Sequence, residues 1–186
     1  VFAIKLPSSV LTVIVVFPTV IFSALMPTMI SDSLVVKGFD TGDVYDITFR
    51  DCVLWNDFAR PMEIGVEIRA DKMHDILFED IDVIHSVTRY PIIGIHHGDR
   101  AEVYNVKFEN INIEHTPGAQ LFDLRITNSA WNKDNKMGKI HDVSFKNINV
   151  LSNSNTENLP YHSRIQGYSD MNDISNISFE NIRVFG

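Results

Sequence analysis

Apolar and polar residues alternate in five short segments of the chain, and these segments resemble one another. They read YDITFRDCVLW from Tyr45, HDILFEDIDVI from His74, YNVKFENINIE from Tyr104, HDVSFKNINVL from His141 and SNISFENIRVF from Ser175. Each contains an aliphatic residue, then Phe two positions later, then Asp or Asn two positions after that. A period of two is typical of β-strands and differs from the 3.6-residue period of helical repeats. The pattern therefore predicts a repeated β unit.

The spacing of the segments predicts how these units are assembled. Their aliphatic anchor positions follow one another at intervals of 29, 30, 37 and 34 residues: Ile47, Ile76, Val106, Val143 and Ile177. Since one such unit cannot bury its apolar face alone, copies at this period indicate a stacked array. We therefore expect an all-β fold over residues 31–186, a right-handed parallel β-helix (solenoid) of about five coils with about three short strands per coil.

Stacking the repeats in register predicts ladders of equivalent side chains. One interior ladder is formed by Phe49, Phe78, Phe108, Phe145 and Phe179. A second contains Cys52, Ile81, Ile111, Ile148 and Ile182, and a third contains Leu54, Val83, Ile113, Val150 and Val184. Cys52 occupies an Ile position, which predicts a buried structural thiol. The turn positions are Asp51, Asp80, Asn110, Asn147 and Asn181. Asp and Asn tolerate the left-handed backbone of a tight corner, so we expect their side chains to bond up the array.

Residues 1–30 differ from the rest of the chain, because the segment Leu6–Ile30 contains no charged residue. An apolar run of this length reaches the roughly 18 residues that suggest a membrane span. Pro18, Pro27 and many β-branched residues disfavour a helix, so a membrane segment is possible but not favoured. Three interpretations stay open for this apolar segment of uncertain status: a membrane or export segment, buried strands, or a stretch translated out of frame.

Composition and charge exclude some functions. The 186 residues are 45% apolar and carry a formal net charge of -8, which is typical of a globular chain. Nucleic-acid binding over a broad face is not expected, because its affinity comes from many cations. A single cysteine excludes an internal disulfide framework. No metal and no organic cofactor is implied.

The candidate chemistry lies in the segments between the repeats. They are SDSLVVKG at 31–38, ARPMEIGVEI at 59–68, YPIIGIHHGDR at 90–100, AQLFDLRI at 119–126 and HSRIQGYSD at 162–170. If Ile64 and Val66 face the interior, strand alternation directs Glu63 and Glu67 outward. The neighbouring coils then add His96 or His97, Asp123 with Arg125, and Arg164 with Gln166 to the same flank. A strip of carboxylates, imidazoles and guanidiniums suits a saccharide, because carboxylates supply acid and base groups and cations bind acidic substituents.

Interpretations that give these residues no functional role stay open. The outer face of any β-helix is polar, so each Glu or Arg taken alone fits a solvated surface. His96 and His97 are weak candidates for a metal pair, because adjacent strand residues point to opposite faces. Trp55 suits either stacking on a sugar ring or packing.

Four of these segments resemble a known family. The succession SDSLVVKG, YDITFRDCVLW, ARPMEIGVEI and HDILFEDIDVIH is similar to the pectin-lyase-like β-helix of polygalacturonase-type glycoside hydrolases. The phrase WNDFARPMEIGVE is also similar to divergent bacterial β-helix hydrolases, including the dextranase-like group. The resemblance covers residues 31–186 and implies hydrolysis of a polysaccharide by carboxylate acid and base catalysis.

The resemblance also implies roles for single residues. Asp32 matches the second of two family aspartates, with Ser31 at the place of the first. Asp32 is then the general acid, with Glu63 or Glu67 as the partner carboxylate. The expected substrate-binding residues are Arg60, His96, Asp123, Arg125 and Arg164. The substrate implies a secreted, periplasmic or cell-surface protein, and the short array suggests that coils of a longer β-helix are missing.

Two alternatives come from other classes. The chain is otherwise a non-catalytic carbohydrate-binding or adhesion β-helix, or an inactive truncated fragment of an enzyme. A polysaccharide lyase is less favoured, because the strip lacks the clustered aspartates that bind Ca²⁺.

Overall fold

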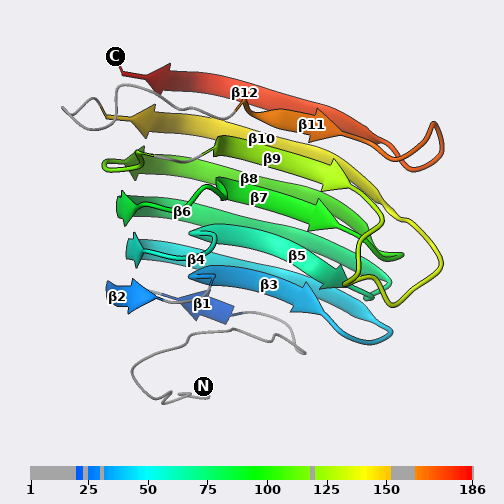
Figure 1. Cartoon of the computed structure of the whole chain (residues 1–186). Helices are drawn as coiled ribbons and strands as arrows, with labels where there is room; N and C mark the ends of the chain where they lie inside the picture. The colour runs from blue at the N-terminus through cyan, green and yellow to red at the C-terminus, as the bar shows by residue number, and fades with distance from the viewer. Residues whose placement is uncertain (1–19, 23–24, 30–31, 118–119, 152–161, 186) are drawn as a thin grey trace.

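The chain folds into a stack of parallel β-coils, as seen in the computed structural model, which describes residues 20–22, 25–29, 32–117, 120–151 and 162–185. Two parallel sheets run along the stack (Figure 1). The fold is therefore the all-β parallel solenoid of about five coils that the repeats predict. No helix long and apolar enough to cross a membrane occurs among the described residues.

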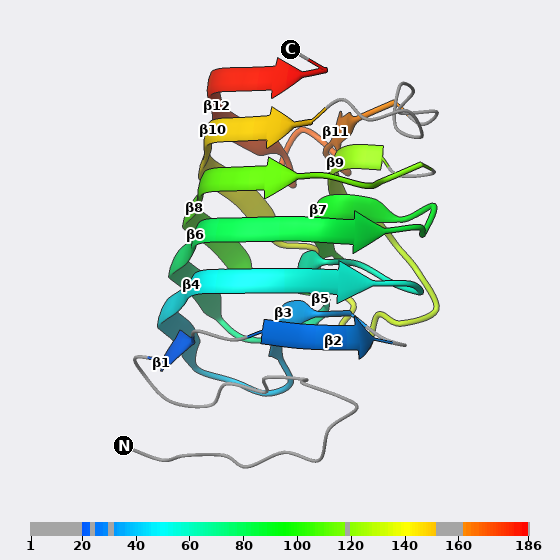
Figure 2. The same ribbon diagram turned by 90° about the vertical axis from the view of Figure 1, so that its left-hand side faces the viewer.

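Each coil contributes one long strand and one short strand. The seven-stranded sheet contains β1 (Val20–Phe22), β2 (Leu25–Met29), β4 (Asp43–Asn56), β6 (Lys72–Ser86), β8 (Glu102–Ile113), β10 (Lys139–Val150) and β12 (Ile174–Val184). The five-stranded sheet contains β3 (Leu34–Gly38), β5 (Met62–Ile68), β7 (Pro91–His97), β9 (Gln120–Ile126) and β11 (Arg164–Gln166). Figure 2 shows the long strands stacked one above another, with the short strands on a separate face.

The long strands bend without breaking, which differs from the three short strands per coil that we expected. Each long strand from β4 to β12 contains two residues with left-handed backbone, at φ between 49° and 58°. The predicted set is Asp51, Asp80, Asn110, Asn147 and Asn181. A second set lies five residues earlier: Asp46, Asp75, Asn105, Asp142 and Asn176. Because equivalent corners stack, the chain turns while its ladder of parallel pairing continues.

Side-chain amides connect the corners from coil to coil. Asn110 donates to Asp80 at 3.0 Å, Asn147 donates to Asn110 at 2.8 Å, and Asn181 donates to Asn147 at 2.7 Å. This confirms the predicted ladder. In the second set, Asn105 donates to Asp75 and Asn176 donates to Asp142, so these corners are bonded in pairs.

The predicted interior ladders form the core from β4 to β10, whereas their members Phe179 and Val184 in β12 are exposed. Phe49, Phe78, Phe108, Phe145 and Phe179 stack with ring centroids 4.8–5.2 Å apart. The Cys52 and Leu54 ladders pair in the predicted register. Cys52 is buried, as its Ile position indicates.

Part of the apolar N-terminal segment contributes strands. Val20 pairs with Ile47, and Leu25 pairs with Val53, so β1 and β2 both lie against β4. Most of residues 1–30, including Pro18, lies outside the described residues.

Candidate functional site

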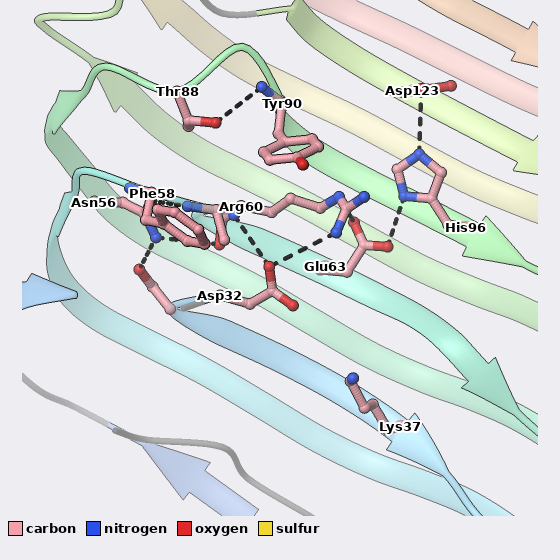
Figure 3. A network of polar contacts seen from close by, with 12 residues as sticks. Asp32, Lys37, Asn56, Phe58, Arg60, Glu63, Thr88, Tyr90, His96 and Asp123 are labelled. Carbon is pink, nitrogen blue, oxygen red and sulfur yellow. Dashed lines mark hydrogen bonds and ion pairs between the residues drawn. The ribbon is translucent and has the colours of Figure 1, made fainter. Parts of the chain in front are cut away.

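The outer face of the five-stranded sheet brings most of the candidate residues together. One row of paired positions runs across the coils as Val35, Glu63, Gly94, Asp123 and Arg164. The next outward row includes His96 beside Arg125. Residues two apart in a strand share a face, so these rows form one strip. Figure 3 shows the polar contacts within it.

Glu63 faces away from the apolar core, yet its side chain is 0% exposed. Its carboxylate crosses the next coil at Gly94, where an added Cβ would lie 2.1 Å from Glu63 Oε2. A residue with a Cβ at position 94 would displace this carboxylate from its place. Gly94 was not among the candidates from the sequence, although a glycine in a strand interior signals such a close approach.

His96 joins the carboxylates of the two neighbouring coils. Its Nδ1 lies 2.6 Å from Glu63 Oε1, and its Nε2 lies 3.2 Å from Asp123 Oδ2. Burial alone would lower the pKa of His96, but the charge of Glu63, the ion-pair contact with Asp123 and the hydrogen bond to Glu63 raise it to about 9. His96 is therefore an imidazolium at neutral pH.

Asp123 forms the upper end of the strip. Arg164 approaches it with two nitrogens, Nε at 3.2 Å and Nη2 at 3.0 Å, and Arg125 Nε lies 3.1 Å from Oδ1. Burial opposes ionisation of Asp123, but His96, Arg164 and Arg125 outweigh it and lower its pKa. Asp123 is thus held as a carboxylate between cations.

Arg60 connects Asp32 to Glu63 at the lower end. Its Nη1 lies 3.8 Å from Asp32 Oδ1, its Nε lies 3.5 Å from Glu63 Oε2, and its backbone N–H donates to Asp32 at 3.1 Å. Burial and the nearby Glu63 charge raise the pKa of Asp32, and the backbone hydrogen bond from Arg60 and the charges of Arg60 and Lys37 only partly offset this. A raised pKa on a partly exposed carboxyl favours a proton donor.

The turn that carries Arg60 is fixed by a buried amide. Asn56 accepts hydrogen bonds from the backbone N–H groups of Phe58 and Ala59, at 3.1 and 2.9 Å, and donates to Ser33 at 2.9 Å. This places the guanidinium of Arg60 over the ring of Tyr90, 4.8 Å from its centroid. Tyr90 is another residue that the sequence did not single out.

The inward-facing residues of β5 differ from the prediction. Val66 was expected to face the interior with Ile64, but Val66 is partly exposed and Ile68 occupies the core position instead. The reason is a register shift, because Val36 pairs with Ile64 while Gly38 pairs with Ile68. Gly65, with φ of 119°, occupies this shift.

Glu67 lies apart from the strip as a result. Its carboxylate binds Lys37 Nζ at 2.7 Å, and this hydrogen bond lowers the pKa of Glu67 against the effect of burial. Glu67 is therefore the one predicted site residue of eight outside the network. The other seven form one connected network: Asp32, Arg60, Glu63, His96, Asp123, Arg125 and Arg164.

His97, the residue after His96, points to the other side of β7. It is buried, and its Nε2 contacts the carbonyl oxygen of Ala101. Burial lowers the pKa of His97 to about 4, against smaller opposing effects from Ala101 and Asp99. His97 is therefore a neutral structural residue outside the network.

Hydrogen-bonding capacity is left over in the network. Four buried side-chain atoms of the strip have ion-pair contacts but no hydrogen bond within the protein: Arg60 Nε, Glu63 Oε2, His96 Nε2 and Arg125 Nε. Buried polar groups normally have such partners. These four atoms instead face charged partners, so ion pairs more than hydrogen bonds hold this part of the network.

One exposed aromatic side chain lies on the turn at the lower end of the strip. Phe58 is 65% exposed, and the same turn carries Arg60, whose backbone N–H donates to Asp32 (Figure 3). Trp55 is less available, since His85 stacks on its ring at 4.2 Å between centroids. This contact favours packing over sugar stacking for Trp55.

Two hollows of the described surface lie away from the strip. One of about 520 Å³ follows the corner ladders past Asp80 and Asn110, and one of about 460 Å³ adjoins Asn128 and Tyr168. No network residue lines either of them. The chemistry of the strip, not a hollow, therefore identifies the candidate site.

No protein-family model, no curated protein and no solved structure matches this chain. The parallel β-solenoid is established by the geometry described above, and the resemblance to polygalacturonase-type hydrolases rests on the sequence segments alone.

Proposed function

We propose that this chain belongs to a β-helix glycoside hydrolase of polygalacturonase-like type that cleaves a polysaccharide. The observation that carries the proposal is the connection of Asp32, Arg60 and Glu63 on one outer strip. Two carboxyl groups there share one guanidinium, and their surroundings differ. Pairs of carboxyl groups in contrasting surroundings are the usual acid and base of glycoside hydrolysis.

The proposed chemistry assigns a separate role to each carboxyl group. Asp32, with its raised pKa and partly exposed side chain, donates a proton to the leaving glycosidic oxygen. Glu63, an ion-pair partner of His96, accepts the proton of the attacking water. Arg60 covers Glu63, so water reaches that carboxylate when Arg60 moves away from it.

The proposed substrate contacts follow from charge and exposure. Arg125 and Arg164 extend from the buried Asp123 with partly exposed guanidiniums, suited to sugar hydroxyl or carboxylate groups. Phe58 supplies an exposed apolar ring on the turn that binds Asp32. A polymer lying across the coils would contact both ends of the strip. We propose an extracellular, periplasmic or cell-surface location, because such polymers occur there.

A second candidate function is supported by a specific observation. Glu63 is fully covered and Asp123 is held by three cations, so the strip is also suited to presenting fixed charges without chemistry. The second proposal is a non-catalytic carbohydrate-binding β-helix that uses Phe58, Arg60 and Arg164.

Reducing-end release from polygalacturonate, dextran, pullulan and xylan tests the first proposal. We expect product from one polymer, and a loss of about 100-fold or more in Asp32→Asn, since general acid catalysis contributes about 10²–10⁴-fold. Glu67→Gln is the matched control, because Glu67 is a carboxylate of the same sheet outside the network, and it should keep its activity.

The other outcomes separate the two candidates. If folded protein releases no product but binds one polymer in calorimetry, and Arg164→Gln weakens that binding, the carbohydrate-binding module is supported. If Asp32→Asn hydrolyses the polymer as fast as the unchanged chain, Asp32 is not the acid. If the folded protein neither hydrolyses nor binds any of the polymers, both proposals are refuted.

A further inference from the structure

Two parallel rows of polar side chains follow one corner of the stack, outside the network described above. The first row is the left-handed corner set that contains Asp80 and Asn110. The second row lies two residues further along each strand and contains Asp82 and Asn112, which are paired positions of neighbouring coils. The residue between the rows, such as Ile111, is buried. Both rows therefore lie on the outside of the solenoid.

A hollow of about 520 Å³ runs between the two rows. Its lining extends from Asp51 and Val53 on β4 to Asn147 and Asn149 on β10, so it crosses four of the coils that are stacked in Figure 2. The volume falls within the range of about 300–1,000 Å³ that is usual for ligand sites. Since neighbouring strands lie about 4.8 Å apart, equivalent polar groups recur at that interval along the hollow.

The amides of the two rows each keep one donor that the ladders do not use. Asn112 donates to Asp82 at 2.9 Å, and Asn149 donates to Asn112 at 3.2 Å. Asn110 and Asn147 form the same kind of ladder at the corner. A carboxamide has two N–H bonds that diverge, so only one of them follows the ladder. Within the described part of the chain, the second N–H of these amides has no acceptor, and it is available to a ligand in the hollow.

Carboxylates line the lower end of the same hollow. Asp80 and Asp82 each accept an amide N–H from the coil above, and a carboxylate has further lone pairs for other donors. Their negative charge disfavours an acidic ligand. The hollow therefore suits a neutral molecule that carries both donors and acceptors along its length, and the hydroxyl groups of a sugar chain are both.

We propose that this hollow binds a neutral β-1,4-linked polysaccharide that lies along the axis of the stack. The rise per sugar of such an extended chain is close to the spacing of the coils. Successive sugars are turned over, so hydroxyl groups occur on both edges of the chain, and one polar row faces each edge. An α-1,4-linked chain curves and cannot follow a straight hollow across four coils. Binding here needs neither acid nor base, so the site goes beyond the hydrolysis proposed for the strip.

Calorimetric titration of the whole chain with cello-oligosaccharides tests the site. We expect affinity to rise from cellobiose to cellotetraose and to level off with longer chains, because the hollow crosses four coils. Maltotetraose, which has the same sugars in α-1,4 linkage, should bind at least 10-fold more weakly than cellotetraose. Tetragalacturonate should also bind the hollow more weakly, because of the carboxylates at its lower end.

Substitutions then locate the binding. Val53 is a partly exposed residue of the lining, so Val53→Arg fills the lower end of the hollow and should weaken cellotetraose binding at least 10-fold. Asn110→Gly and Asn112→Ala should each weaken it about 3–10-fold, as expected for one lost hydrogen bond. Asn105→Gly is the matched control: Asn105 is also a left-handed, ladder-bonded corner of β8, but it does not line the hollow. It should bind as tightly as the unchanged chain.

The remaining outcomes contradict the proposal. It is overturned if the folded chain does not bind cellotetraose, if maltotetraose binds equally well, or if folded Val53→Arg binds as tightly as the unchanged chain. It is also overturned if Arg164→Gln weakens the binding and Asn112→Ala does not, since the sugar then lies on the strip. Circular dichroism verifies the folding of each variant. Asp32→Asn should bind cellotetraose like the unchanged chain, so a failure of hydrolysis and a failure of this site are told apart.

Discussion

His96 and His97 are neighbours in sequence with opposite electrostatic surroundings. Alternation along β7 places His96 on the outer strip between Glu63 and Asp123, and His97 inside, against the Ala101 carbonyl. Burial opposes the charged form of both rings, but only His96 has carboxylates close enough to outweigh it. The pKa of His96 is thus raised to about 9, and that of His97 is lowered to about 4.

These two shifts predict a maximum of stability near pH 6.5. His96 keeps its proton in the folded state after the unfolded chain has lost it, so its contribution is complete below pH 6.5 and is lost as the pH rises to about 9. This contribution is on the order of 3 kcal/mol. His97 acts in the opposite sense: its contribution is present above pH 6.5 and is lost as the pH falls toward 4.

Urea unfolding at pH values between 4 and 9 measures both slopes. In His96→Gln, the free energy of unfolding should no longer decline between pH 6.5 and 9. In His97→Gln, that decline should remain, and the decline of the free energy of unfolding from pH 6.5 toward pH 4 should become smaller. If the free energy of unfolding of His96→Gln declines between pH 6.5 and 9 as steeply as that of the unchanged chain, the His96 ion pairs do not stabilise the fold.

At the scale of elements, the corners of the long strands combine a backbone requirement with a side-chain requirement. Asn110 has φ of 55°, donates to Asp80 and accepts from Asn147. Asn112, two residues further along β8, donates to Asp82 and accepts from Asn149, without a left-handed backbone. The two asparagines have the same type of ladder bonds and differ in conformation.

This pair separates the two requirements experimentally. Asn110→Ala should destabilise the chain by about 2–3 kcal/mol, about 1 kcal/mol more than Asn112→Ala, because alanine at a left-handed position adds about 1–2 kcal/mol of strain to the lost hydrogen bonds. Asn110→Gly should recover most of that difference, since glycine adopts this backbone freely. The measurement is the free energy of unfolding in urea. Equal values for Asn110→Ala and Asn112→Ala would show that the conformation has little effect.

The long strands were predictable from sequence for the same reason that they are regular. Phe108 and Asn110 have equivalents in every repeat, and equivalent residues stack, so the ladders and one set of corners follow from the alignment. The Asp46 set was missed although an Asp or Asn precedes every anchor residue. Its signal is as regular as that of the Asp51 set.

The short strands were less predictable, because they share no repeated motif. The order of the network follows from the pairing of Glu63 with Gly94 and of Gly94 with Asp123, which the uneven intervals between repeats obscure. The register shift at Gly65 also removed Val66 from the core and separated Glu67 from Glu63. The alternation of inward and outward residues along a strand does not predict the exposure of Val66 or the separation of Glu67 from Glu63. It did predict that Asp123 and one of His96 and His97 point outward.

For the whole molecule, each coil is stabilised by the coil above and the coil below it. Phe108 lies in the middle of the Phe ladder, fully buried between Phe78 and Phe145. Phe179 belongs to the same ladder in β12, but it is 47% exposed. The same residue type in the same register therefore has two different surroundings.

This gradient predicts unequal costs for the same substitution. Phe108→Ala should lower the free energy of unfolding by about 3–5 kcal/mol, because it leaves a cavity between two stacked rings. Phe179→Ala should cost less than half as much, since the ring is already half in water and contacts Phe145 and Phe122 only from one side of the ladder. Urea unfolding followed by circular dichroism measures both. Stability in a stack is a sum over neighbouring coils, so loss of a central contact divides the array while loss of a terminal one shortens it. Equal losses for the two variants would mean that the described coils unfold as one unit whose stability does not depend on position along the stack.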